Sequence, residues 1–217
     1  MVTDNQLIAQ YKSDFKTAIN AVSEQYYYNQ RDLEYINSQI GEQVHKDVLK
    51  FFIPKYGERL FCYELYHQFR LIIEKSTVYQ NVFLQAEIRK DFLLDSIYIG
   101  LSIEELSQVF IPDFIIHDPK NALKQHLIIE VKTNPYTEDR NIISDLNKLI
   151  EFIEKYKFEH GIFLITNYTN DNVKKIIKDN IGYLANTILD TLDEISIMVK
   201  LDCNSELFET ILSDIIE

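Results

Sequence analysis

Two short apolar runs in the middle of the chain have the pattern of buried strands. Residues 109–116 and 126–133 are rich in Ile, Val, Leu and Phe, and the polar segment 118–125 lies between them. Runs of this length, separated by a turn-forming segment that contains proline, are typical of paired strands. The pattern therefore predicts a β-hairpin.

Apolar positions at helical spacing flank this hairpin on both sides. Residues 58–74 predict a helix and residues 79–88 a strand after it. Beyond the hairpin, the pattern predicts an amphipathic helix from Asp139 to Tyr156, a buried strand over 160–167 and a closing helix over 170–181, capped by Asn170 or Asp171. The predicted order is helix, strand, strand, strand, helix, strand, helix, which is an α/β fold.

The two ends of the chain carry weaker patterns. Residues 3–50 have apolar positions compatible with helices, and the tail predicts a strand over 194–201 and a last helix from Ser205. The 217 residues are 46% hydrophobic, and no Gly/Pro/Ser linker or repeat divides them. A chain of this size can bury one sizeable core, so we expect a single domain.

Three charged residues interrupt the two predicted strands. Asp113 lies in the first, and Glu130 and Lys132 lie in the second. Burial of an ionised group costs several kcal/mol unless the group is paired or holds a metal. Folding the hairpin about its loop places Asp113 opposite Glu130, and the strand period of two places Glu130 and Lys132 on one face. We therefore expect two carboxylates and an ammonium to converge.

These residues resemble a known family. Pro112-Asp113 followed by Glu130-Val131-Lys132 is similar to the motif of the PD-(D/E)XK nuclease superfamily, and the resemblance covers about residues 55–170. The motif is short, and its specificity comes from its place on apolar strands at hairpin spacing. The resemblance implies a restriction-endonuclease-like core, a small mixed sheet of four to five strands flanked by helices. It divides the domain into a helical N-terminal extension (1–50), a nuclease core (55–185) and a C-terminal addition (186–217).

The resemblance also implies the chemistry of the site. Asp113 and Glu130 are hard oxygen ligands suited to Mg²⁺ or Mn²⁺, and the backbone carbonyl of Val131 would be a further ligand. Lys132 would orient or activate the attacking water, or stabilise the charge that develops on phosphorus. The choice between these two roles stays open, as does the number of ions.

Further side chains are candidates for the same site. Many family members supply another acid from the preceding helix; Glu64 is the first choice, Glu58 a weaker one, and Glu87 an alternative on the first strand. His117 could contact substrate or metal, although a histidine at a hairpin end is more often solvated. The remaining candidates are His67 and Arg70 as phosphate contacts or helix-surface pairs, and Lys148 as a supporting residue on the helix after the hairpin.

Net charge limits how such an enzyme would bind its substrate. The formal charge is −12, whereas recognition of a phosphate backbone relies on Lys and Arg. Local basic clusters, a homodimer that pools them, or a basic partner protein could compensate. The expected activity is that of a metal-dependent nuclease acting on nucleic acid, with DNA as the substrate expected by family analogy, in bacterial defence or genome processing. The rivals are a non-catalytic adaptor of the same fold and an ordinary α/β binding domain.

Several other classes of protein are disfavoured by the sequence. The first residues lack the pattern of a signal peptide, and no apolar stretch is long enough to cross a bilayer, so we expect a soluble cytoplasmic protein. The two cysteines, Cys62 and Cys203, do not have metal-ligand spacing. A glycine-rich phosphate-binding loop is also missing from the sequence, which disfavours an activity driven by nucleotide hydrolysis.

Overall fold

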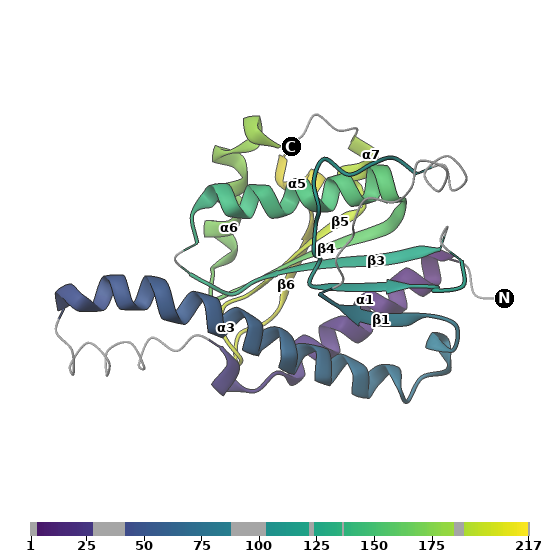
Figure 1. The fold of residues 1–217 in the computed structure, drawn as a ribbon, viewed down its shortest axis with the longest axis horizontal. Helices are drawn as coiled ribbons and strands as arrows, with labels where there is room; N and C mark the ends of the chain where they lie inside the picture. Colours follow the sequence, from purple (N-terminus) through teal and green to yellow (C-terminus); the bar gives the residue numbers. More distant parts are fainter. Residues whose placement is uncertain are drawn as a thin grey trace.

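A six-stranded open sheet is the centre of the fold (Figure 1). The computed structural model describes residues 4–27, 42–87, 103–121, 124–135, 137–184 and 189–216. The strands lie in chain order across the sheet, antiparallel from β1 to β3, parallel from β3 to β5 and antiparallel from β5 to β6. They are β1 (Phe83–Ala86), β2 (Phe114–His117), β3 (Gln125–Lys132), β4 (Phe158–Thr166), β5 (Ile195–Lys200) and β6 (Phe208–Ile211).

Helices cover both faces of this sheet (Figure 1). One face carries α1 (Asp4–Ala21) and the long α3 (Glu42–Ile73). The other face carries α5 (Asp139–Tyr156), α6 (Asn170–Asp179) and the short helices α7 (Leu189–Asp193) and α8 (Leu212–Ile216). Short 3₁₀ turns η1 (Glu24–Tyr26), η2 (Thr77–Tyr79) and η3 (Ile181–Tyr183) complete the described elements. Within these residues, no helix is both long and apolar enough to span a membrane.

Alternate side chains of β3 point to opposite faces of the sheet, so this strand contributes to two hydrophobic clusters. Ile128 packs in the cluster formed with α5, whereas Ile129 and Val131 pack in the cluster formed with α1 and α3. Phe114 and Ile116 of β2 join the second cluster as well. Since both faces of β3 are covered, any charged side chain on this strand lies inside the molecule unless it is near the strand end.

Most of the predicted elements are confirmed. The helix from Asp139 to Tyr156 has the predicted bounds, and the predicted strands of the hairpin are β2 and β3. The predicted helix 58–74 is the second half of α3. The expectation of an α/β fold with a mixed sheet flanked by helices therefore holds, while residues 28–41 of the predicted N-terminal helices lie outside the described part.

Two predictions about the sheet and its C-terminal end are wrong. The sheet has six strands instead of four to five, and the segment after Ser205 forms β6 before the five-residue α8. All four residues of β6 are half-buried and belong to an edge strand paired with β5. In a short edge strand of this kind, apolar and polar residues alternate over only a few positions. Such a short pattern is easily mistaken for part of a helical pattern.

Thr169 caps α6, in place of Asn170 or Asp171. Its side-chain oxygen accepts a hydrogen bond from the Asn172 backbone N–H at 3.3 Å. Thr169→Ala is therefore expected to lower the free energy of unfolding by about 1 kcal/mol, measured by urea denaturation. Asn170→Ala is the matched control and should have a smaller effect; an equal loss from the two variants would contradict the assignment of the cap.

Candidate functional site

The β2–β3 register brings Asp113 and Glu130 to the same region. Phe114 pairs with Ile129, and Asp113 immediately precedes this pair. One carboxylate oxygen of Asp113, Oδ2, accepts a hydrogen bond from the Val131 backbone N–H at 2.7 Å. Glu130, on the adjacent position of β3, is 3% exposed. A hydrogen bond from the strand backbone thus fixes the half-buried Asp113 carboxylate beside the buried Glu130.

Helix α5 adds a lysine and a third acid above β3. The Lys148 ammonium lies 2.6 Å from Glu130 Oε2 and 3.8 Å from Asp145 Oδ1. The second oxygen of Asp145, Oδ2, lies 3.0 Å from the ammonium of Lys132. Asp145 and Lys148 are three residues apart and therefore share one side of the helix. That side is the one that faces Glu130 and Lys132.

Helix α3 adds a fourth acid from the opposite layer. Glu58 Oε1 lies 3.6 Å from the Lys132 ammonium, and Glu58 Oε2 accepts a hydrogen bond from the Thr133 backbone N–H at 3.2 Å. Lys132 is therefore held between an acid from α3 and an acid from α5. The six residues that meet here are called the carboxylate–lysine cluster below: Glu58, Asp113, Glu130, Lys132, Asp145 and Lys148.

The cluster carries more negative than positive charge in a partly buried place. Four carboxylates against two ammonium groups give a net charge of −2 when all six are ionised. Burial raises the pKa of Asp113 to about 6, raises that of Glu58, and raises that of Glu130 well above its usual range. Burial alone would lower the pKa of Lys132, but Asp145 and Glu58 outweigh it and raise that pKa. The site therefore favours a further positive charge.

The residues present fit a hard divalent cation, although they are not gathered around one position. Within the described ranges, no group of three or more His, Cys, Asp or Glu residues is arranged to hold a metal ion. The Lys148 ammonium is the cation next to Glu130. Glu130 Oε1 is buried without a hydrogen-bond partner, and an oxygen of this kind is a ready ligand for Mg²⁺ or Mn²⁺. Asp113, Glu130 and the Val131 carbonyl are the donors that would hold such an ion.

Of the three candidates for an additional acid, Glu58 is the one that joins the cluster. Glu64 lies six residues further along α3 and is therefore turned about 120° away around the helix. Its Oε1 accepts a hydrogen bond from Gln68 Nε2 at 2.7 Å. Glu87 is exposed and lies 3.5 Å from Arg59, an ion pair at the surface. The first choice among these acids, Glu64, is thus replaced by Glu58.

The other predicted residues divide between the cluster and the surface. Lys148 is in the cluster, in direct contact with Glu130. His117 lies at the far end of β2 from Asp113, about 13 Å along the strand, and hydrogen-bonds Gln85 Oε1 at 2.5 Å. His67 is exposed on α3, and Arg70 pairs with Glu74 at 2.6 Å in an exposed i,i+4 contact. Among the described residues, the ion pairs and hydrogen bonds that define the cluster involve none of these last three.

The sequence interpretation missed Asp145. The feature of the sequence that could have indicated Asp145 is its spacing from Lys148, because residues three apart lie on the same side of a helix. Asp145 bridges both lysines of the cluster, at 3.0 Å to Lys132 and 3.8 Å to Lys148. We infer that it sets the position of both ammonium groups.

A second polar arrangement lies at the other end of the sheet. His160 Nε2 is 3.0 Å from Ser196 Oγ, and His160 Nδ1 is 3.3 Å from Glu194 Oε2. This order of groups is that of a serine-hydrolase triad. Ser196 is fully buried, however, and Glu209 Oε1 also accepts from its hydroxyl at 3.3 Å. A nucleophile that no substrate can reach does not make a catalytic site, so we treat this arrangement as structural.

His160 predicts a loss of stability in acid. Burial, with a smaller effect from Lys12, lowers its pKa to about 3, while Glu209 opposes this; Ser196 and Glu194 are its other polar neighbours. The folded protein keeps this ring neutral, whereas the unfolded chain protonates it near pH 6.5. Its contribution is present above pH 6.5 and is lost as the pH falls toward 3, by about 1.4 kcal/mol per pH unit.

Urea denaturation between pH 7 and pH 4.5 measures this effect. The wild type should lose stability more steeply than the His160→Gln protein, since glutamine does not titrate. Equal slopes for the two proteins would show that His160 is not held neutral. The comparison cancels the contributions of all other titratable groups that the two proteins share.

No match to this chain was found among models of known protein families, among curated proteins or among solved structures. The residues of the cluster and their geometry therefore carry the functional inference.

Proposed function

We propose that the protein is a metal-dependent nuclease that hydrolyses phosphodiester bonds of nucleic acid, with DNA as the preferred substrate. The observation that carries the proposal is the convergence of the half-buried carboxylate of Asp113 and the buried carboxylate of Glu130 beside Lys132. Burial raises the pKa of both acids, which is the condition that a bound divalent cation would relieve. Mg²⁺ or Mn²⁺ would neutralise charge on the scissile phosphate and lower the pKa of a bound water.

The order of the elements supports the proposal. Helix α3 is followed by β1, β2 and β3, then by α5, β4 and α6. This order of helix, three strands, helix, strand and helix is the one expected for a PD-(D/E)XK core. The Pro112-Asp113 and Glu130-Val131-Lys132 segments lie at adjacent strands within it. The strands β5 and β6 extend the same sheet beyond this core.

Each residue of the cluster has a distinct part in the proposed reaction. Asp113 and Glu130 supply the carboxylates, and the backbone N–H of Val131 holds Asp113 in place. The ammonium of Lys132 orients the attacking water or stabilises the charge that develops on the phosphate oxygens. Glu58 and Asp145 form ion pairs with that ammonium from two sides, which fixes its position. Lys148 balances Glu130 when no substrate is bound.

The net negative charge of the chain affects how it would bind a nucleic-acid substrate. A net charge of −12 repels a polyanion at a distance, so binding must depend on local basic surface. The exposed lysines of α6, Lys175 and Lys178, are one such surface. A basic partner protein or a second copy of the chain would strengthen it.

A substrate panel tests the proposed activity. The wild-type protein is incubated with Mg²⁺ or Mn²⁺ and with linear, circular, single-stranded and branched DNA and with RNA, next to Asp113→Ala and Lys132→Ala. We expect cleavage of at least one DNA by the wild type, its loss in EDTA and its loss in both variants. Failure of the wild type to cut any substrate, or equal cutting by the variants, would contradict the proposal and favour the non-catalytic adaptor.

A further inference from the structure

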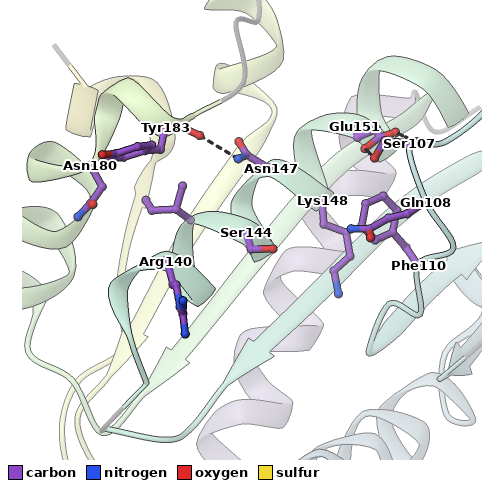
Figure 2. A pocket seen from close by; sticks show the side chains of 11 residues that line it. Ser107, Gln108, Phe110, Arg140, Ser144, Asn147, Lys148, Glu151, Asn180 and Tyr183 are labelled. Carbon is purple, nitrogen blue, oxygen red and sulfur yellow. Dashed lines mark hydrogen bonds between the residues drawn. The ribbon is translucent and has the colours of Figure 1, made fainter.

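A cavity of about 560 Å³ lies along α5, and Lys148 of the carboxylate–lysine cluster is among the residues that line it (Figure 2). Its floor is α5, and its walls are the segment before β2 and the turn after α6. Cavities of about 300–1,000 Å³ are of the size that holds small organic ligands. Its lining residues are Ser107, Gln108, Phe110, Arg140, Ile143, Ser144, Asn147, Lys148, Glu151, Asn180 and Tyr183.

Two cationic side chains and one acid line this cavity, and the cations are the groups that would contact a phosphate anion. Arg140 and Lys148 are its cationic residues, and Glu151 is its acid. The carboxylate of Glu151 is already engaged by the backbone N–H of Ser107, by the Ser107 hydroxyl at 2.7 Å and by the Lys155 ammonium at 2.8 Å. The side chain of Arg140 is 80% exposed, and its Nε pairs with Glu138. Lys148 likewise pairs with Glu130, so a phosphate at either cation would displace a carboxylate of the protein.

Aromatic and amide groups in the cavity favour a nucleobase beside that anion. Tyr183 is 76% exposed, and its backbone carbonyl accepts a hydrogen bond from Asn147 Nδ2 at 3.0 Å (Figure 2). The ring of Phe110 lines the cavity near Lys148, and Asn180 supplies an amide side chain near Tyr183 (Figure 2). Stacking on an exposed ring binds any base, while amides hydrogen-bond base edges.

Lys148 links the cavity to the cluster. Its side chain lines the cavity, and its ammonium lies 2.6 Å from Glu130. Figure 2 shows this side chain extending from α5 toward the strands below. Arg140 and Lys148 are eight residues apart, about 12 Å along the helix, a span that exceeds one nucleotide. A strand that contacts both cations would therefore pass beside Glu130.

We propose that this cavity binds a short single-stranded segment of nucleic acid, with phosphates at Arg140 and Lys148 and a base stacked on Tyr183. The inference rests on the proposed nuclease function, because it assigns the cavity to the strand that the cluster cuts. It adds the surface that recognises the substrate, which the motif residues alone do not supply.

Fluorescence anisotropy tests the inference without cleavage. A fluorescein-labelled ten-nucleotide single strand is titrated in EDTA with the wild type, Tyr183→Ala and Arg140→Ala. The matched controls are Tyr63→Ala and Lys75→Ala, which remove an exposed tyrosine and an exposed lysine elsewhere. We expect Tyr183→Ala to weaken binding at least about fivefold, since stacking on an aromatic ring contributes strongly for each base. Arg140→Ala should weaken binding and make it less dependent on salt.

Competition and cleavage then separate the possible outcomes. If unlabelled thymidine monophosphate displaces the strand at the concentrations at which the unlabelled strand does, the cavity is a site for free nucleotide, and the strand assignment is overturned. If the wild type cuts DNA while the Tyr183 and Arg140 variants bind like the controls, the inference fails and the nuclease function stands. If the wild type binds through the cavity but cuts nothing, the cavity assignment stands and the nuclease function fails.

Discussion

Lys132→Met is expected to slow DNA cleavage about 100- to 10,000-fold, the range in which a positioned acid–base group contributes to a rate. The ammonium of Lys132 is held at 3.0 Å from Asp145 and 3.6 Å from Glu58, so it has a defined position beside Glu130. Methionine keeps most of the length of the side chain and removes the charge. The measurement is the single-turnover rate on a labelled DNA substrate in Mn²⁺.

The loss should appear in the chemical step and leave substrate affinity nearly unchanged. Lys75→Met serves as the control, because Lys75 is exposed in the turn after α3. A Lys132→Met protein that folds, as judged by its urea midpoint, and cuts within threefold of the wild type would rule out a catalytic role for this ammonium.

Lys148→Met is expected to lower the free energy of unfolding by about 3 kcal/mol, since it removes one partner of a buried ion pair. Glu130 is 3% exposed and would keep its carboxylate without the ammonium that lies 2.6 Å from Oε2. The cost is limited by protonation of Glu130, whose pKa burial already raises. Urea denaturation at pH 8 measures the effect where protonation helps least.

The double variant Lys148→Met/Glu130→Gln isolates the pair. Replacing both partners should recover most of the lost stability, because neither charge then remains buried alone. A double variant no more stable than Lys148→Met would show that Lys148 stabilises the fold through its packing on α5 and not through Glu130.

The fold could be predicted from the sequence where hydrophobic spacing is strong. Helix α5 has buried residues on one stripe from Ile142 to Tyr156, and its bounds follow from that stripe. The parallel strands β4 and β5 are buried along almost their whole length, so their apolar runs are plain in the sequence. The edge strand β6 was missed because its four residues are all half-buried and give no such contrast.

The site could be predicted in part, because only local geometry follows from spacing. Strand pairing places Asp113 near Glu130, and that follows from the length of the hairpin. Spacing does not predict which acid of α3 joins the site, because that depends on which side of the helix faces the sheet. Glu58 and Glu64 both lie on the helix, and tertiary packing turns Glu58 toward Lys132. The bridge from Asp145 to Lys132 likewise depends on how α5 lies over β3.

We propose that Asp113 and Glu130 hold a divalent cation beside Lys132. Isothermal titration of Mn²⁺ into the metal-free protein at pH 7.5 tests it most directly, with Glu130→Gln beside the wild type and Glu64→Gln as the control. We expect saturable binding by the wild type and by Glu64→Gln, and its loss in Glu130→Gln. Absence of Mn²⁺ binding in the wild type, or binding that Glu130→Gln leaves unchanged, would contradict the claim.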